Sequence, residues 1–380
     1  MSMVDADFLV IGAGIAGASA AYWLAPHGRV VILERESQPG YHSTGRSAAL
    51  FMESYGTPQV RALTMASRAF LESPPPGFCD HPLLTPRGAL MVATPAETVQ
   101  LQAHWQVLQQ VSPRGQLLDA QAAFELTPIL RRELLHGAVY EPDASDMDVH
   151  GLHQGYLRGV RRHGGQLLLN AEVQAMAHDG RGWVVHTTVG TCRAPVVLNA
   201  AGAWADGIGH IAGARPIRLS PKRRSAFIFT LPEGLNASGW PMTIGVSEDW
   251  YIKPDAGMML GSPANADPVP PQDVQPEAWD IALAIDRIQT MTTLQIQRPT
   301  RTWAGLRSFV ADGDLVGGWD AQIPGFFWVA AQGGYGIQTS PAMGEACALL
   351  ARGVALSGHL QSFGLTPSML APDRLHAQTL

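Results

Sequence analysis

The chain has 380 residues, of which 46% are hydrophobic and 15% charged, and its net charge is −6. This length and apolar content indicate one large or two globular domains and exclude a disordered chain. The negative charge gives no electrostatic reason to bind nucleic acid or anionic lipid. The three cysteines are scattered, so we expect reduced thiols and a cytoplasmic setting. No apolar run reaches about 18 residues, which argues against a membrane span.

The first recognisable unit spans residues 8–34 and reads as strand, glycine turn, helix, strand and acid. An apolar run at 8–11 leads into three glycines with GxGxxG spacing, namely Gly12, Gly14 and Gly17. A second apolar run at 30–33 ends at Glu34. Such glycines allow a tight turn, close approach of the backbone to a pyrophosphate, and close packing of helix on sheet, while the acid accepts a ribose hydroxyl. The unit therefore predicts a site for a dinucleotide that carries no 2′-phosphate. Because its first strand begins within ten residues of Met1, we expect no secretory signal.

The remaining elements follow from periodicity and turn residues. We expect helices over 58–72, most of 96–127, 148–163, 278–291 and 340–350. We expect strands over 89–93, 166–170, 182–187, 195–199, 225–230, 250–260 and from 325 onward. Parallel-type pieces at both ends and antiparallel pieces between them predict an α/β fold with a discontinuous, Rossmann-like cofactor domain (1–80, 147–215, 300–380). An α+β substrate domain built on an antiparallel sheet (81–146, 216–299) is inserted into it.

Several longer runs carry a resemblance to a known family. They are 39–49 (PGYHSTGRSAA), 221–229 (PKRRSAFIF), 260–267 (LGSPANAD), 303–309 (WAGLRSF) and 331–336 (AQGGYG). Together with the N-terminal unit, they resemble the D-amino acid oxidase superfamily of flavoproteins over nearly the whole chain, and within it the bacterial FAD-dependent D-arginine dehydrogenases. The resemblance implies FAD rather than NAD. It also implies oxidation of a Cα–H that bears an amine, with hydride passing to flavin N5 and the imino acid then hydrolysing.

Position by position, the resemblance also assigns roles around the substrate. Arg224 and Arg307 correspond to a clamp for the substrate carboxylate, to which a planar, permanently charged guanidinium is well suited. Tyr55 and Tyr251 correspond to hydroxyls that orient the carboxylate or cover the pocket. The neighbouring Arg223 is interpreted as the partner in a surface ion pair. The full predicted catalytic set is Tyr55, Arg224, Tyr251, Arg307, Gly334 and Gln338.

The residues expected to hold FAD lie on the glycine turn, the polar loop after the second strand and the later glycine-containing turns. They are Gly12, Gly14, Ile15, Ala16, Gly17, Glu34, Arg35, Ser43, Thr44, Arg46, Ser47, Ala49, Val173, Ala201, Gly202, Trp204, Gly333, Gly334, Tyr335, Gly336, Ile337 and Gln338. Relatives with covalent flavin have a cysteine near 306–309. This chain has none there, so we expect FAD to be bound non-covalently.

Departures from the D-arginine enzymes bear on substrate choice. Leu50, Met52 and Ala89 stand where those enzymes have histidine, threonine and the glutamate that holds the guanidinium. Burying a cationic side chain without its counter-charge costs several kcal/mol. With Met91 these residues predict an apolar pocket, and hence D-amino acids with neutral or apolar side chains. No base is evident near the substrate, so its amine would lose a proton through water or in solution.

Two alternatives stay open. One is the same flavin chemistry on a 2-hydroxy acid or a secondary amine, and the other is a flavin-binding protein without turnover. Either quinone or oxygen could reoxidise the flavin. No His/Cys cluster has metal-site spacing, so we expect no metal. His42 lies in the flavin loop, where we expect a loop hydrogen bond rather than proton transfer.

Overall fold

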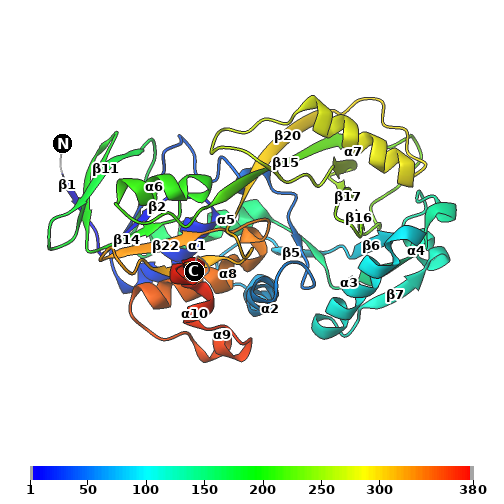
Figure 1. Ribbon diagram of the computed structural model, residues 1–380. Coiled ribbons are helices and arrows are strands. Elements are labelled where there is room, and N and C mark those ends of the chain that lie inside the picture. The colour runs from blue at the N-terminus through cyan, green and yellow to red at the C-terminus, as the bar shows by residue number, and fades with distance from the viewer. Residues whose placement is uncertain (1–2, 377–380) are drawn as a thin grey trace.

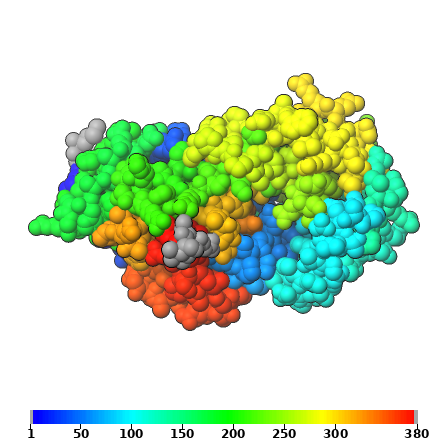
Figure 2. Space-filling model, in the orientation of Figure 1, coloured from blue at the N-terminus to red at the C-terminus, as the bar shows by residue number. Residues whose placement is uncertain are grey.

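The computed structural model describes residues 3–376, which form two lobes, each centred on a large sheet (Figure 1). The space-filling view shows them as well, with the cyan and yellow parts of the chain making the right-hand lobe (Figure 2). The left-hand lobe contains a six-stranded sheet in the order β10-β3-β2-β14-β22-β21, parallel except between β21 and β22. Its strands are β2 (Phe8–Ile11), β3 (Val30–Leu33), β10 (Gln166–Leu168), β14 (Val196–Asn199), β21 (Val316–Trp319) and β22 (Phe326–Ala330).

Both faces of this sheet are buried, as its continuous apolar strands require. Phe8 and Val10 pack against helices, while Leu9 and Ile11 face the other way, which is the period-2 alternation of a strand. The helical side consists of α1 (Ile15–Leu24), α2 (Pro58–Glu72), α5 (Val149–Arg162) and α8 (Gly336–Ala351). The opposite side is covered by α6 (Ala205–Ile211) and a sheet of β1 (Met3–Asp5), β11 (Val173–His178), β12 (Trp183–Thr187) and β13 (Gly190–Ala194).

The right-hand lobe contains a nine-stranded sheet in the order β19-β15-β18-β17-β16-β6-β8-β7, with β20 on the other side of β15. Its strands are β6 (Ala89–Ala93), β7 (Gln116–Asp119), β8 (Gly137–Glu141), β15 (Ser220–Phe229), β16 (Met242–Gly245), β17 (Tyr251–Asp255), β18 (Met258–Ser262), β19 (Asp267–Pro268) and β20 (Arg301–Phe309). The pairing is antiparallel except between β6 and β16. Helices α4 (Ala120–Leu126) and α7 (Ala278–Met291) cover one face, and α3 (Thr98–Val111) packs on the other.

A small three-stranded sheet pairs β9 (Ser145–Met147) with β4 (Leu50–Phe51) on one side and β5 (Leu84–Pro86) on the other. Two helix ends near it show how local sequence sets element bounds. Thr57 caps α2 by accepting from the Val60 N–H at 3.3 Å, and Asp148 caps α5 by accepting from Gly151 N–H at 2.8 Å.

The α/β fold with an inserted second unit is confirmed. The stretch 96–127 is largely helical, as predicted, and its two helices α3 and α4 are separated by Pro113 and β7. The strand β16 was not predicted. The boundary placed at residue 300 lies before β20, yet β20 pairs with β15 from Arg301 to Phe309 and so belongs with the nine-stranded sheet.

Three further facts concern the part of the chain from residue 3 to 376. Cys192 and Cys347 are buried free thiols, and Cys79 is half-buried. No helix in this part is long and apolar enough to cross a membrane. No group of three or more His, Cys, Asp or Glu side chains in this part has the arrangement of a metal site.

Candidate active site

A cavity of about 320 Å³ lies in the left-hand lobe at the carboxyl ends of its parallel strands. Gly12 follows β2, Glu34 follows β3, Ala201 follows β14 and Ala331 follows β22, and all four line the cavity. This is the place where open α/β sheets bind ligands, because the turns after adjacent strands diverge there.

The three glycines of the first turn differ in what a side chain at each position would contact. Gly12 has φ +102°, and a Cβ on it would lie 2.5 Å from the Ala200 carbonyl oxygen. A Cβ on Gly17 would lie 1.9 Å from the Gly12 carbonyl oxygen, so this glycine lets α1 pack against the turn. A Cβ on Gly14 would meet only Thr44 Oγ1, at 3.4 Å. The fold therefore requires Gly12 and Gly17, whereas Gly14 keeps space open toward the cavity, as a pyrophosphate cradle needs.

Polar groups line the far end of this cavity. The buried Glu34 carboxylate accepts from the N–H groups of Ala13 at 2.9 Å and Glu36 at 3.0 Å, which fixes its position beside the turn. The Arg35 guanidinium lies 4.8 Å from the Trp204 ring centroid. His42 Nε2 lies 2.9 Å from Glu36 Oε1, so the predicted loop hydrogen bond of His42 is present. A carboxylate, a planar cation and an indole suit the ribose and adenine of a dinucleotide.

Most predicted cofactor residues line this cavity or the one that continues from it toward the second lobe. They are Gly12, Gly14, Ile15, Ala16, Glu34, Arg35, Ser43, Thr44, Arg46, Ser47, Val173, Ala201, Gly202, Trp204, Gly333, Gly334, Gly336 and Ile337. Ala49 and Gln338 instead line the substrate end described next. Tyr335 is a correction, since it lines none of these cavities, whereas Gly17 has the helix-packing role that the sequence predicts. Gly17 packs α1 on the turn, and the Tyr335 ring lies 5.0 Å from that of Tyr55.

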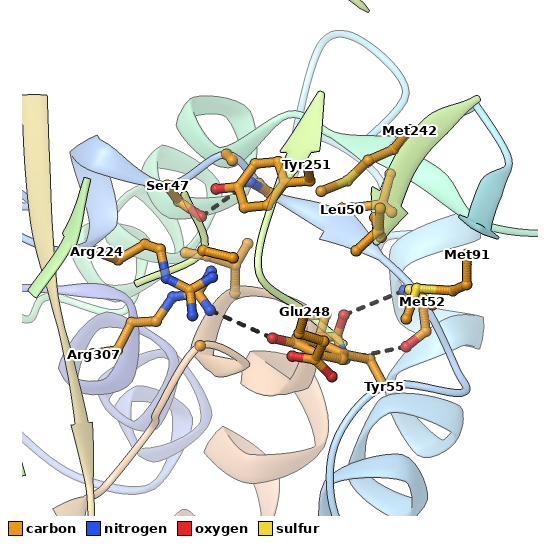
Figure 3. A pocket seen from close by; sticks show the side chains of 17 residues that line it. Ser47, Leu50, Met52, Tyr55, Met91, Arg224, Met242, Glu248, Tyr251 and Arg307 are labelled. Atoms are coloured by element: carbon orange, nitrogen blue, oxygen red, sulfur yellow. Dashed lines mark hydrogen bonds between the residues drawn. The ribbon is translucent and has the colours of Figure 1, made fainter. Parts of the chain in front are cut away.

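The cavity continues between the lobes, and Figure 3 shows its far end. Arg224 and Arg307 lie at one end of it, and Leu50, Met91 and Met242 at the other. The register of β15 and β20 places the two arginines together: Lys222 pairs with Arg307 and Arg224 pairs with Gly305. Arg224 and Arg307 are therefore diagonal neighbours on one face of the sheet.

Both guanidinium groups are held by neutral partners. Arg224 Nε donates to the Asn265 main-chain oxygen at 2.6 Å, and Arg307 Nη1 donates to the Tyr55 hydroxyl at 3.4 Å. Within residues 3–376 neither arginine forms an ion pair with a carboxylate. Burial, together with the positive charge of Arg307, lowers the pKa of Arg224. Two desolvated cations side by side call for an anion between them.

The neighbouring Arg223 gives the contrast. Its Nε donates to Asp280 at 2.9 Å, and Glu277 and Asp267 also pair with it. The predicted ion pair is present, although Arg223 is buried rather than on the surface. Adjacent arginines on one strand point to opposite faces, so one is neutralised inside the lobe and the other is left to the cavity.

The other end of the cavity is apolar. Met91, Ile244 and Tyr251 form one row across β6, β16 and β17, because Ile244 pairs with both of the others. Leu50, Met52 and Met91 line the cavity at the predicted place. Ala89 is a correction: it is fully buried and pairs with Met242, whose side chain reaches the cavity in its place.

Sequence reasoning missed five residues that line the substrate end, namely Ala48, Met242, Ile244, Glu248 and Ala264. Met242 and Ile244 lie on β16, a strand that was not predicted. Glu248 is exposed and lies at the cavity rim, on the loop before Tyr251 with φ +53°. Its position in an acidic loop just before a predicted site tyrosine was the available signal.

Similar proteins are known. Residues 7–350 match the family described as "FAD dependent oxidoreductase". Glycine oxidase of Geobacillus kaustophilus (strain HTA426) is 25% identical over 370 residues, which cover 95% of this chain and 96% of that protein. L-2-hydroxyglutarate dehydrogenase of Salmonella houtenae is 26% identical over 218 residues, which cover 55% of this chain and 50% of that protein.

Solved structures agree in fold. The glycine oxidase from Geobacillus kaustophilus superposes with a TM-score of 0.82 at 23% identity, covering 96% of this chain and 99% of that one. L-proline dehydrogenase from P. horikoshii gives a TM-score of 0.82 at 20% identity and covers 100% of both chains. The two-lobed architecture is therefore shared over nearly the full length.

Proposed function

Because the chain belongs to the family of FAD-dependent oxidoreductases that includes the D-amino acid oxidases, we propose that it oxidises D-amino acids with neutral or apolar side chains to 2-oxo acids and ammonia. The family predicted from sequence is confirmed, and with it the dependence on FAD. The choice of substrate within the family is our proposal.

One observation carries it: two guanidinium groups without a carboxylate partner in the described chain face one end of a cavity whose other end is apolar. Arg224 and Arg307 would hold the substrate carboxylate, and Leu50, Met91 and Met242 would contact its side chain. Each buried methylene of substrate then gains about 0.8 kcal/mol, whereas a charged group would lose hydration.

Orientation is the main contribution of these residues. Clamping the carboxylate at one end and the side chain at the other places Cα at the junction with the flavin channel, where Gly334 and Ile337 line both cavities. FAD, when bound, supplies the acceptor for the hydride that leaves Cα. Burial raises the pKa of the Tyr55 hydroxyl, which therefore stays protonated and able to donate to the carboxylate.

The amine must be neutral before Cα loses hydride. The ionisable side chains among the described residues that line the substrate end are Tyr55, Tyr251, Glu248 and the two arginines. Of these, the exposed Glu248 lies at the rim, so we propose that the amine loses its proton in solution or through water. FAD would be held non-covalently: the thiols of Cys192 and Cys347 are buried elsewhere and Cys79 is outside the cavity lining. Quinone or oxygen would reoxidise it.

A substrate panel tests the proposal. D- and L-amino acids, 2-hydroxy acids and N-methyl amino acids are mixed with the FAD-loaded enzyme and an artificial electron acceptor, and ammonia and 2-oxo acid are measured. We expect D-leucine and D-methionine to be oxidised with equal yields of ammonia and 2-oxo acid. Products without ammonia would establish the alternative of a 2-hydroxy acid or secondary amine. No bleaching of the flavin absorbance by any compound without oxygen would establish the non-catalytic alternative.

Glu248 offers a sharp internal comparison within that panel. Its carboxylate is the one acidic group among the described residues that line the substrate end, so it would be the counter-charge if the substrate were cationic. We expect both the wild type and Glu248→Gln to oxidise D-leucine faster than D-arginine. A wild-type preference for D-arginine that Glu248→Gln removes would contradict the apolar assignment.

A further inference from the structure

A buried carboxylate lies behind the substrate cavity and is not part of its lining. Glu141 ends strand β8 and is 1% exposed. Its Oε1 accepts from the Glu53 main-chain N–H at 2.7 Å, and its Oε2 accepts from the Ser54 hydroxyl at 2.5 Å. Both donors belong to the turn at 52–55, between β4 and α2. Charge-assisted hydrogen bonds of this kind are among the strongest that a side chain makes to a loop.

That turn carries two cavity residues, Met52 and Tyr55. Its start is held by Gln338, which accepts from Met52 N–H at 3.2 Å and donates to Met52 O at 3.3 Å. Its middle, Glu53 and Ser54, is held by the carboxylate of Glu141. Tyr55 follows directly and accepts from Arg307 at 3.4 Å, a long contact that a small shift of the turn would break.

We propose that Glu141 is a positioning residue for substrate binding: its carboxylate fixes the 52–55 turn from behind, so that Tyr55 meets Arg307 at the carboxylate end of the cavity and Met52 forms part of the apolar end. The proposal rests on the proposed function for the identity of the substrate, while the tethering of the turn does not. Nothing in the lining of the cavity itself marks Glu141, which acts only through Ser54 and Glu53.

The energetic cost of this arrangement argues for a purpose other than stability. Burial, with the nearby charge of Glu53, raises the pKa of Glu141 to about 7 against the hydrogen bonds that lower it. A carboxyl whose pKa is higher in the folded state than its ordinary 4.5 loses stabilisation as the pH rises from that value through about 7. At about pH 8 the ionised side chain therefore weakens the fold, and an uncharged isostere would not.

The ionisable groups around Glu141 come from the 52–55 turn and from two helices, α2 and α3. Glu53 pairs with Arg68 of α2. His104 of α3 has Nε2 3.5 Å from the Ser54 hydroxyl, and burial, with the charge of Arg61, lowers its pKa to about 4. His104 is thus neutral throughout the neutral pH range. Titration near pH 7 at this turn is assigned to Glu141, since the nearby histidine ionises far below.

The test compares three variants of the FAD-loaded protein. Glu141→Gln keeps the shape but loses the charge, and Ser54→Ala removes one donor while keeping the carboxylate. Asp320→Asn is the matched control: Asp320 also ties a tight loop, accepting from Gln322 N–H, Ile323 N–H and Trp328 Nε1, each at 3.0 Å, but in the other lobe. Amide hydrogen exchange is followed over residues 52–56, and binding of 4-methylpentanoate, an apolar carboxylate, by calorimetry.

We expect Glu141→Gln and Ser54→Ala to speed exchange of the Glu53 amide, and Glu141→Gln to weaken 4-methylpentanoate binding about tenfold, as loss of a charge-assisted bond implies. At about pH 8 the Tm of Glu141→Gln should equal or exceed that of the wild type. The wild-type Kd should rise as the pH falls through about 7, and the Kd of Glu141→Gln should lack that step. In Asp320→Asn the amide exchange over residues 52–56 and the Kd with its pH dependence should stay at wild-type values.

Two results would overturn the proposal. Unchanged exchange and Kd in Glu141→Gln would show that the turn is held without Glu141. Weakened binding with a Tm that falls in parallel would show a merely structural role. Exchange and probe binding need no turnover, so a failure of the substrate panel leaves these measurements decisive on their own.

Discussion

The cofactor half and the substrate half of the active site are built in opposite ways. Much of the cofactor cavity is made of turns that directly follow β2, β3, β14 and β22, so many of its residues lie within a few residues of the strand that places them. The substrate cavity combines the 47–55 segment with side chains from β6, β15, β16, β17 and β20, which are brought together by sheet register. The first half depends on backbone geometry and the second on side-chain identity. Substitutions should therefore fail in different ways in the two halves.

The glycine turn gives the largest expected effect. Gly14 has φ −72° and ψ −178°, which any residue adopts, and its Cβ would point into open space beside Thr44. Gly14→Val should therefore fold, yet fill the pyrophosphate cradle and come out colourless with no turnover. The ratio of flavin to protein absorbance in the purified protein measures this.

Gly17→Ala is the matched contrast. Its added methyl group would meet the Gly12 carbonyl oxygen at 1.9 Å, which neither backbone can avoid. We expect a loss of stability at or beyond the usual range of about 1–3 kcal/mol for overpacking, visible as insoluble protein or a lowered Tm. Should Gly14→Val keep its flavin at wild-type stoichiometry, the cradle is not where we place it.

The same contrast explains what could be predicted from the sequence. Gly12, Gly14, Gly17 and Glu34 are local signals. Helices α2 and α7 have the predicted bounds because apolar periodicity marks both and the capping residue Thr57 marks the start of α2. Met242 and Ile244 could not be found in that way, because a cavity residue on a central strand looks like any core residue until its register is known. The predicted pocket role of Ala89 was wrong for the same reason, because its cross-strand partner Met242 reaches the cavity instead.

The carboxylate clamp gives the next largest effect. Arg307→Ala and Arg224→Ala should each keep FAD but lose about 2–4 kcal/mol of substrate binding in the transition state, or about 30- to 1,000-fold in kcat/KM. The exposed Arg298→Ala is the control and should behave as wild type. Normal kinetics in both clamp variants would mean that the carboxylate is held elsewhere or that the substrate has none.

The apolar wall gives a smaller and selective effect. Met242→Ala removes a side chain that lines the cavity opposite the clamp, and its neighbours on β6 and β17 stay in place. We expect kcat/KM for D-leucine to fall by about 1–2 kcal/mol, or about 5- to 30-fold, while the value for D-alanine changes little. Parallel losses for both substrates would show that Met242 supports the fold of the cavity rather than contacting the side chain.

The smallest expected effect concerns how Arg224 is aimed. Its Nε donates to the main-chain oxygen of Asn265, and the Asn265 side chain is tied on both sides: Oδ1 accepts from Ser225 N–H at 2.8 Å and Nδ2 donates to Asp280 at 3.0 Å. Asn265→Ala keeps the main-chain acceptor but frees the loop that presents it. Loss of about 1 kcal/mol of orientation should raise KM about fivefold with little change in kcat.

The control for this variant is Asn236→Ala, which removes a similar Asn side chain from an exposed loop where it accepts only from Ser238 N–H at 3.0 Å. Its KM should equal that of the wild type. Because the substrate half depends on side chains held by other side chains, a defect should appear in Asn265→Ala although the residue lies outside the cavity lining. An unchanged KM in Asn265→Ala would mean that the strand register of β15 and β20 alone is enough to orient Arg224. The substrate half would then depend on its backbone as much as the cofactor half does.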